Sequence, residues 1–198
     1  MSHYYQTDPN LDTTEFPITF EIGQHSFTLN SSAGVFSKEG LDTGSRILVE
    51  TILEKASPVS DLLDLGCGIG VIGVILATAW NCQITAIDPN GQACHLAKEN
   101  YAKYHVQAAV LEQDHVDDKL YPMIVLNPPI RTGKQVIYAL FEQSAAHLLP
   151  GGSLWIVIRK QHGAQSAMDK LKELGLETNR VARDKGFWVI EAKKPVTK

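Results

Sequence analysis

The sequence lacks the features that mark membrane, secreted and disordered proteins. Its 198 residues contain no apolar run near the roughly 20 residues that a membrane-spanning helix needs. The start, Met1-Ser2-His3-Tyr4-Tyr5, shows no basic-then-apolar signal sequence. Charged residues make up only 20% of the chain and hydrophobic residues 44%, a balance that favours a buried core over disorder. We therefore expect a cytoplasmic protein with no membrane partner, folded as a single domain over residues 1–198.

Cysteine is also scarce, and its spacing excludes two common uses. Cys67, Cys82 and Cys94 form no CxxC pair and have no His/Cys cluster nearby, which argues against a disulfide framework and a zinc site. We expect no metal. The net charge of −4 at pH 7 argues against binding nucleic acid by overall charge, although a local basic patch is compatible with it.

Alternating apolar and polar residues predict a β-hairpin near the beginning of the chain. Ile18–Ile22 and Ser26–Leu29 have the two-residue period of strands, with Gly23-Gln24-His25 between them. We assign residues 1–33 to an N-terminal arm and a hairpin that covers a larger body, and residues 34–198 to that body.

From Asp61 onward, short apolar runs alternate with helical segments, as in βαβ units. The sequence predicts an α/β fold: a seven-stranded, mostly parallel Rossmann-like sheet with helices on both faces and an antiparallel hairpin at its edge. The expected strands are Leu62–Leu65, Gln83–Ile87, Gln107–Leu111, Met123–Leu126, Ser153–Ile158, Glu177–Val181 and Phe187–Ala192. The expected helices are about Gly44–Ala56, Val71–Trp80, Gly91–Tyr104, Gly133–Leu148 and Ala164–Leu174, with Pro150-Gly151-Gly152 stopping the fourth.

A glycine-rich turn follows the first strand of this sheet. Such a turn lets the backbone approach a ligand, and the following helix offers free N–H groups and a partial positive charge. Gly68–Gly73 matches the dinucleotide pattern GxGxxG, while Asp64–Gly70 matches the DxGxGxG of methyltransferases, so the loop alone leaves both open. Asp88 closes the next strand, 20 positions past Gly68, where a carboxylate accepts hydrogen bonds from ribose hydroxyls.

A second motif, Asn127-Pro128-Pro129-Ile130, follows the strand Met123–Leu126. The prolines stiffen a turn whose carbonyls face outward, at the strand end where α/β folds bind ligands. Two acceptors beside a methyl donor would hold the hydrogens of an exocyclic amine and aim its lone pair at the methyl group. A dehydrogenase needs a proton donor or acceptor there instead, and this motif has none. The motif therefore favours methyl transfer to nitrogen.

Together these motifs resemble a class I S-adenosylmethionine-dependent methyltransferase of the methyltransferase small domain family, which includes ribosomal small-subunit guanine amino-methyltransferases. The resemblance extends to Gly34–Ser45, similar to the family's GVFS…LDxGS segment, and to Pro150–Trp155 and Arg159-Lys160. It implies S-adenosylmethionine as cofactor, with Asp64 near its amino group, Asp88 on the ribose and Asp114 or its neighbour Asp117 on the adenine. The implied cofactor-binding residues are Asp64, Gly66, Cys67, Gly68, Gly70, Asp88, Asp114 and Asn127.

The resemblance also implies how a substrate is bound. Asn127, Pro128 and Pro129 form the catalytic motif, with the target amine on Asn127 and the Pro128 carbonyl. The implied substrate-binding residues are Phe36, Asp42, Ile130, Arg131 and Lys134. Ile130 departs from the aromatic residue that often follows Asn-Pro-Pro, where stacking contributes roughly 1–3 kcal/mol per base. Three explanations of this departure stay open. Phe36 or another aromatic residue could stack on the base, Ile130 itself could pack on it, or the substrate is not a base.

Basic residues near the expected strand ends suit contact with an RNA backbone; they are Arg131, Lys134, Arg159, Lys160, His162, Arg180, Arg183 and Lys185. The resemblance implies guanine N2 of small-subunit (16S) ribosomal RNA as substrate, free or in an assembly intermediate. A protein glutamine amide and a non-catalytic cofactor-binding module are the alternatives. A homodimer stays open, because the larger ribosomal enzymes look duplicated whereas this chain has one copy.

Overall fold

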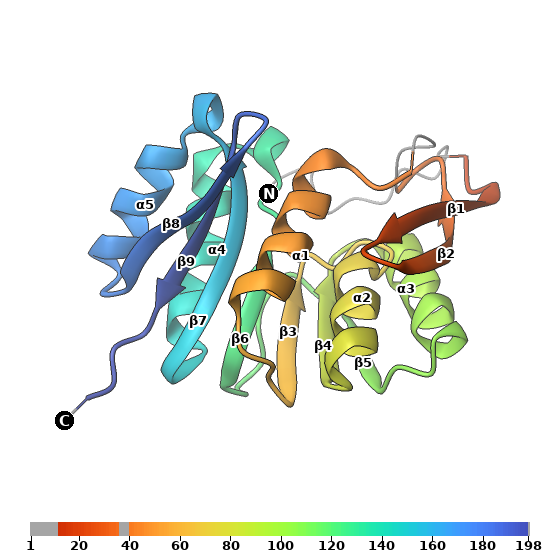
Figure 1. Cartoon of the computed structure of the whole chain (residues 1–198), viewed down its shortest axis with the longest axis horizontal. Coiled ribbons are helices and arrows are strands. Elements are labelled where there is room, and N and C mark those ends of the chain that lie inside the picture. The colour runs from red at the N-terminus through yellow and green to blue at the C-terminus, as the bar shows by residue number, and fades with distance from the viewer. Residues whose placement is uncertain (1–11, 36–39, 198) are drawn as a thin grey trace.

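The computed structural model describes residues 12–35 and 40–197 of the chain. The strands of its main sheet are β3 (Asp61–Leu65), β4 (Gln83–Asp88), β5 (Ala108–Glu112), β6 (Tyr121–Leu126), β7 (Leu148–Arg159), β8 (Glu177–Asp184) and β9 (Phe187–Lys193). They lie in the order β5-β4-β3-β6-β7-β9-β8 (Figure 1). Every pair is parallel except the two that involve β9. The expected fold class is confirmed, with β8 and β9 as the antiparallel hairpin at one edge.

Two layers of helices cover the sheet, because its strands are apolar on both faces. The helices are α1 (Thr43–Lys55), α2 (Val71–Trp80), α3 (Gly91–Lys103), α4 (Lys134–Ala146) and α5 (Ala164–Glu173), with short 3₁₀ turns η2 (Ile130–Thr132) and η3 (Lys160–His162). Leu62 and Val125 pack with α1, α2 and α3, whereas the adjacent Leu63 and Ile124 pack with α4 and α5. Among the described helices, none combines the length and the apolar character needed to cross a membrane.

The predicted hairpin is present as β1 (Glu15–Ile22) and β2 (His25–Ser32), paired antiparallel. Its alternation turns Ile18, Phe20 and Leu29 inward, and they join the core formed by α1, α2 and α3. The rings of Phe20 and Phe27 stack with centroids 5.6 Å apart. The hairpin therefore lies over α2 and α3 (Figure 1).

One predicted boundary is wrong: α4 ends at Ala146, and Leu148 already belongs to β7. The His147 N–H closes the helix on the carbonyls of Gln143 and Ser144, while the His147 carbonyl accepts the N–H of Tyr121 on β6 at 2.8 Å. Pro150-Gly151-Gly152 therefore lies inside β7, where the pairing with β6 shifts register. A Cβ at Gly152 would come within 2.9 Å of two backbone carbonyl oxygens, so close backbone approach requires glycine there.

Candidate active site

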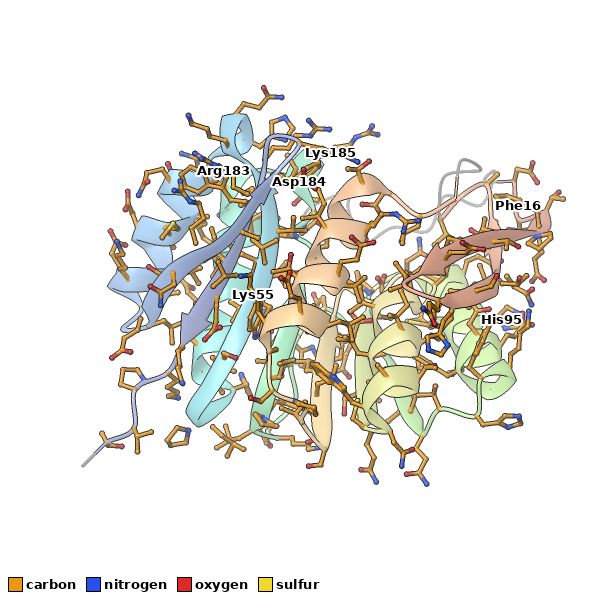
Figure 2. All side chains as sticks on the ribbon, viewed as in Figure 1. Phe16, Lys55, His95, Arg183, Asp184 and Lys185 are labelled. Carbon is orange, nitrogen blue, oxygen red and sulfur yellow. The ribbon has the colours of Figure 1, made fainter. Side chains whose placement is uncertain are left out.

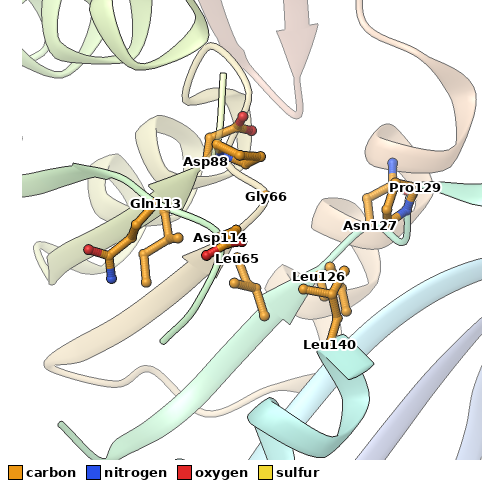
Figure 3. A pocket seen from close by; sticks show the side chains of 11 residues that line it. Leu65, Gly66, Asp88, Gln113, Asp114, Leu126, Asn127, Pro129 and Leu140 are labelled. Carbon is orange, nitrogen blue, oxygen red and sulfur yellow. The ribbon is translucent and has the colours of Figure 1, made fainter. Parts of the chain in front are cut away.

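A pocket opens at the carboxyl ends of the central strands (Figure 3). The chain leaves β3 towards β4 and β5 on one side and later reaches β6 and β7 on the other, so strand order reverses beside β3. Open α/β sheets bind ligands at such a reversal. The lining residues are Leu65, Gly66, Ile87, Asp88, Pro89, Gln113, Asp114, Leu126, Asn127, Pro129 and Leu140.

The glycine turn between β3 and α2 forms the floor of this site. Gly66, Gly68 and Gly70 have φ angles of +72°, +55° and +90°, a region that side chains rarely adopt. A Cβ built on Gly66 or Gly68 would meet no atom within 4 Å. The turn thus requires these glycines for its backbone conformation, and it leaves open space where a ligand could lie against the main chain.

Gly73 completes the GxGxxG pattern for a reason unrelated to any ligand. A Cβ there would collide with the hydroxyl of Tyr101, which projects from α3 between the two helices. Gly73 therefore allows α2 and α3 to pack closely around a fully buried tyrosine. Since packing alone accounts for this glycine, it carries no weight for a dinucleotide.

Asp64 lies beneath the turn and is 1% exposed. The pKa of its carboxyl group is raised from 3.8 to about 7, chiefly by burial; a hydrogen bond from the Gly73 N–H opposes this shift, and the nearby Asp88 adds to it. Within the described part of the chain, no hydrogen bond reaches Oδ2. A hydrogen-bond donor from a ligand would stabilise this buried oxygen. The ammonium group of an amino-acid ligand, or a water that bridges to it, is such a donor.

Asp88 ends β4 at the wall of the pocket. Its Oδ2 accepts the Gly68 N–H at 3.0 Å and its Oδ1 accepts the Asn90 N–H at 2.9 Å. Burial raises the pKa of Asp88, and these two hydrogen bonds oppose the shift. Each carboxylate oxygen has a second lone pair, so Asp88 can hold the glycine turn and still accept hydrogen bonds from a diol.

Asp114 and Asp117, the two residues predicted to reach the adenine, lie in different places beyond β5. Asp114 lines the pocket with an exposed side chain, 3.1 Å from His115 Nδ1. Asp117 instead accepts the Tyr121 hydroxyl at 3.2 Å, beside the start of β6. Gln113, which was not predicted as a site residue, lines the pocket and donates its N–H to the Asp88 carbonyl at 3.2 Å. Its position directly after a predicted strand is the signal that could have identified it.

The Asn-Pro-Pro motif faces this acidic wall: Figure 3 shows Asn127 and Pro129 on one side of the pocket and Asp88, Gln113 and Asp114 on the other. Asn127 Nδ2 donates to Ser45 Oγ on α1 at 3.0 Å. The Pro129 carbonyl accepts both the N–H and the hydroxyl of Thr132, at 3.0 and 2.6 Å. The Pro129 carbonyl is thus held by η2. Of the two acceptors expected for an amine, Asn127 lines the pocket, whereas Pro128 is buried and is not among the lining residues.

Two predicted site residues have side chains directed elsewhere. Cys67 is buried in the core, its thiol donates to the Gly68 carbonyl and its N–H to the Ile87 carbonyl, and burial raises its thiol pKa well above the ordinary value. Asp42 caps α1 by accepting the Ser45 N–H at 2.9 Å, and it does not line the pocket. Neither residue is among those that line the pocket, and cofactor binding by Cys67 and substrate binding by Asp42 stay predictions.

The remaining predicted substrate residues lie just past the motif. Ile130 is half-buried in η2 and packs on the core below α4, whereas Arg131 and Lys134 are exposed beside it. Phe36 lies outside the described residues.

Asn100 on α3 is a second contact that the sequence did not reveal. It is fully buried, and its amide joins two distant segments. Oδ1 accepts the Asn30 N–H at 2.8 Å, while Nδ2 donates to the carbonyls of Asn30 at 3.0 Å and Ile69 at 2.8 Å. Asn100 thereby ties the N-terminal hairpin to the glycine turn.

The strand order, the pocket at the order reversal and the Asn-Pro-Pro turn together define the α/β class of methyltransferases. The 16S rRNA N2 methyltransferase RsmC of T. thermophilus, solved in complex with AdoMet and guanosine, shares this fold with a TM-score of 0.81 at 23% identity, over 94% of this chain and 51% of that chain. The family described as methyltransferase small domain matches residues 26–191. The chain belongs to this family.

Two curated relatives differ in how much of their length is shared. Protein YbxB of Bacillus subtilis (strain 168), described as uncharacterized, is 40% identical over 198 residues, which covers 97% of this chain and 98% of that protein. Ribosomal RNA small subunit methyltransferase C of Haemophilus influenzae (strain PittGG) is 36% identical over 163 residues, covering 77% of this chain and 48% of that enzyme. The chain thus spans about half the length of the ribosomal enzyme.

Proposed function

We propose that this protein binds S-adenosylmethionine in the pocket and transfers its methyl group to an exocyclic amine, with guanine N2 of small-subunit ribosomal RNA as the substrate. The bound cofactor supplies a methyl group on a sulfonium. The single observation that carries the proposal is Asn127, held at the pocket wall opposite Asp88 and Asp114.

Two acidic residues of the pocket wall and one buried beneath the glycine turn match polar groups of the cofactor. Asp64, whose Oδ2 receives no hydrogen bond from the described residues, lies beneath the turn and offers that oxygen to the ammonium group. Asp88 accepts the ribose hydroxyls, and Asp114 accepts the adenine amine. The open backbone at Gly66 and Gly68 gives space for the chain between them. A charge-assisted hydrogen bond contributes roughly 1.5–3 kcal/mol, so each of these contacts is worth about tenfold or more in affinity.

The Asn-Pro-Pro turn contributes positioning. Asn127 and the Pro128 carbonyl accept the two hydrogens of the target amine, which directs the nitrogen lone pair towards the methyl group. A hydrogen bond to each acceptor also stabilises the positive charge that develops on nitrogen. As the nitrogen–carbon bond forms, the carbon–sulfur bond would break and the sulfur would leave as a neutral thioether. The methylated nitrogen would then lose one of its protons to solvent. The protein itself forms no covalent bond, and the rate gain comes from holding the two reactants in line.

Two observations support RNA as the substrate. The curated relative from H. influenzae is a ribosomal RNA small subunit methyltransferase. Basic side chains also gather at the carboxyl edge, where Arg131 and Lys134 are exposed and the Arg159 guanidinium lies 4.4 Å from the ring centre of Phe187. A guanidinium held on a ring is pre-oriented for a phosphate or a base.

The test is transfer of radiolabelled methyl from S-adenosylmethionine to small-subunit ribosomal RNA, to small subunits and to total protein, all from a strain lacking the gene. We expect label in RNA, recovered as N2-methylguanosine after nucleoside analysis. Label recovered as N-methylglutamine would replace RNA with a protein substrate, and tight cofactor binding without any transfer would contradict an enzymatic role.

Two substitutions separate cofactor binding from chemistry. We expect Asp88→Ala to raise the dissociation constant for S-adenosylmethionine by about tenfold or more, because it removes the ribose acceptor. We expect Asn127→Ala to lower the methyl-transfer rate while the cofactor affinity, measured by calorimetry, stays within about twofold. Equal losses of affinity and rate in Asn127→Ala would remove Asn127 from its assigned role.

A further inference from the structure

The first turn of α1 is held firmly against the Asn-Pro-Pro motif. Asp42 caps the helix through the Ser45 N–H at 2.9 Å and, with its carbonyl, through the Arg46 N–H at 3.1 Å. The Arg46 guanidinium donates to the Glu21 carbonyl of the hairpin. On the other side, an ideal Cβ at Gly44 would lie 3.1 Å from the ring of Phe187, so the helix end packs closely on β9.

Within this fixed turn, Ser45 directs its hydroxyl at the catalytic motif. Ser45 is 7% exposed, and its Oγ accepts a hydrogen bond from Asn127 Nδ2 at 3.0 Å. The two residues are 82 positions apart in the chain. The hydroxyl is not needed to cap the helix, because the Asp42 carboxylate already does so.

The orientation of the Asn127 amide decides whether it can bind an amine. The amide has a donor end, Nδ2, and an acceptor end, Oδ1. An exocyclic amine presents hydrogens, so only Oδ1 can receive it, and an inverted amide would set N–H against N–H. Nδ2 points at the Ser45 hydroxyl, which accepts its hydrogen bond at 3.0 Å, so Oδ1 is the end of the amide that remains for the substrate.

We propose that Ser45 is a positioning residue for methyl transfer, acting through Asn127 by holding its side-chain amide in the orientation that accepts the target amine. This inference rests on the proposed function, since it gives the same motif the same reaction. It adds a residue from a different element, α1, that is not among the residues lining the pocket. The role of Ser45 depends on its contact with Asn127, so a hydroxyl at another position would not replace it.

Thr51 provides a matched control on the same helix. Its hydroxyl is also buried, but it donates to the Ile47 carbonyl of its own helix at 2.6 Å. Thr51→Val and Ser45→Ala each remove one buried hydroxyl from α1. We expect Ser45→Ala to lower the single-turnover methyl-transfer rate on small-subunit RNA about tenfold, the loss of one hydrogen bond. Cofactor affinity should stay within about twofold in both variants, and Thr51→Val should keep the wild-type rate.

A double-mutant cycle then tests whether Ser45 works through Asn127. In an Asn127→Ala background, Ser45→Ala should change the rate by less than about twofold, because the amide it orients is gone. An unchanged rate in Ser45→Ala alone, or the same tenfold loss in both backgrounds, would overturn the proposal.

NMR measurement of the Asn127 side-chain amide protons tests the role of Ser45 without a substrate. With S-adenosylmethionine added, the Nδ2 protons should exchange slowly with solvent in the wild type and in Thr51→Val, and faster in Ser45→Ala. Equal exchange in all three proteins would overturn the role of Ser45. If the wild-type protein transfers no methyl to RNA, the proposed function fails, and these resonances still determine whether Ser45 holds the amide.

Discussion

Among single residues, Asp64 shows how the site trades stability for binding. Its carboxyl group is buried beneath the glycine turn near Asp88, Cys67 and Tyr101, and none of the charged neighbours that shift its pKa is a cation. The Tyr101 hydroxyl is likewise buried without a hydrogen bond in the described part of the chain. Such a carboxylate is costly to ionise without a cation beside it, and a bound ammonium group would offset that cost.

This cost gives a pH dependence of stability. The pKa of Asp64 is about 7 in the folded protein, against the ordinary value of 3.8 that applies to the unfolded chain. The folded state therefore binds more protons between these values, so the stability contributed by the protonated group is complete below pH ~4 and is lost as pH rises through ~7. From about pH 5 to about pH 8 the loss is ~3 kcal/mol. We expect Asp64→Asn to remove this loss in urea unfolding of the protein without cofactor.

Asp61→Asn is the control for the preceding prediction. Asp61 begins the same strand but pairs with Lys119 at 2.9 Å near the surface. Its substitution should leave the difference between about pH 5 and about pH 8 in place. Parallel stability profiles for the wild type and Asp64→Asn would show that Asp64 does not carry the effect.

The sequence predicts those site residues that lie in local motifs and misses those that depend on tertiary contacts. Asp64, Asp88 and Asn127 each lie within one residue of the end of a strand that has a recognisable pattern, so their place at one sheet edge could be inferred. Ser45 and Asn100 act on partners 82 and 70 positions away. No local spacing encodes such pairs.

At the scale of elements, alternation and periodicity identify strands and helices, but not how one element docks on another. They predict the hairpin β1–β2 but not its attachment to α3. Periodicity also misplaces the end of α4. That end depends on a contact with another element, because the Tyr121 N–H of β6 binds the His147 carbonyl. The hairpin is attached at Thr28 by the Tyr104 hydroxyl at 2.7 Å, and at Asn30 by Asn100.

These two attachments differ in whether they reach the glycine turn. Asn100 also binds the Ile69 carbonyl, whereas Tyr104 contacts the hairpin at Thr28. We expect Asn100→Ala to raise the dissociation constant for S-adenosylmethionine by about tenfold, because it frees the turn as well as leaving buried groups unpaired. Tyr104→Phe should loosen the hairpin while the affinity stays within about twofold.

Hydrogen exchange of the β2 amides and calorimetric titration with cofactor measure the two effects separately. Both variants should speed exchange in β2, and only Asn100→Ala should weaken cofactor binding. If Tyr104→Phe weakens it equally, hairpin docking itself, and not the link at Asn100, sets the conformation of the turn.

At the scale of the whole molecule, charge is distributed unevenly. The net charge is −4, yet the carboxyl edge that contains the pocket also carries Arg131, Lys134, Arg183 near the end of β8 and Lys185 in the β8–β9 turn. Figure 2 shows Arg183 and Lys185 at this end of the molecule and Lys55 towards the opposite end of α1. An acidic body with a basic edge would repel RNA in most orientations and favour the one that presents bases to the pocket.

The location of charge, not its total, should therefore control RNA binding. Two double variants of equal net charge test this: Arg131 and Lys134 both changed to Glu, and Lys55 and Lys193 both changed to Glu. The second pair lies at the amino edge of the sheet, where it lines a groove with Pro150 and Gly151. We expect the first variant to bind small-subunit RNA more weakly and to reduce the slope of log K against log salt by about 1.5 to 2. The second should keep the wild-type slope, since its lysines lie away from the bound backbone. Equal slopes in both variants would mean that RNA responds to net charge alone, and the carboxyl edge would lose its assigned role as the RNA surface.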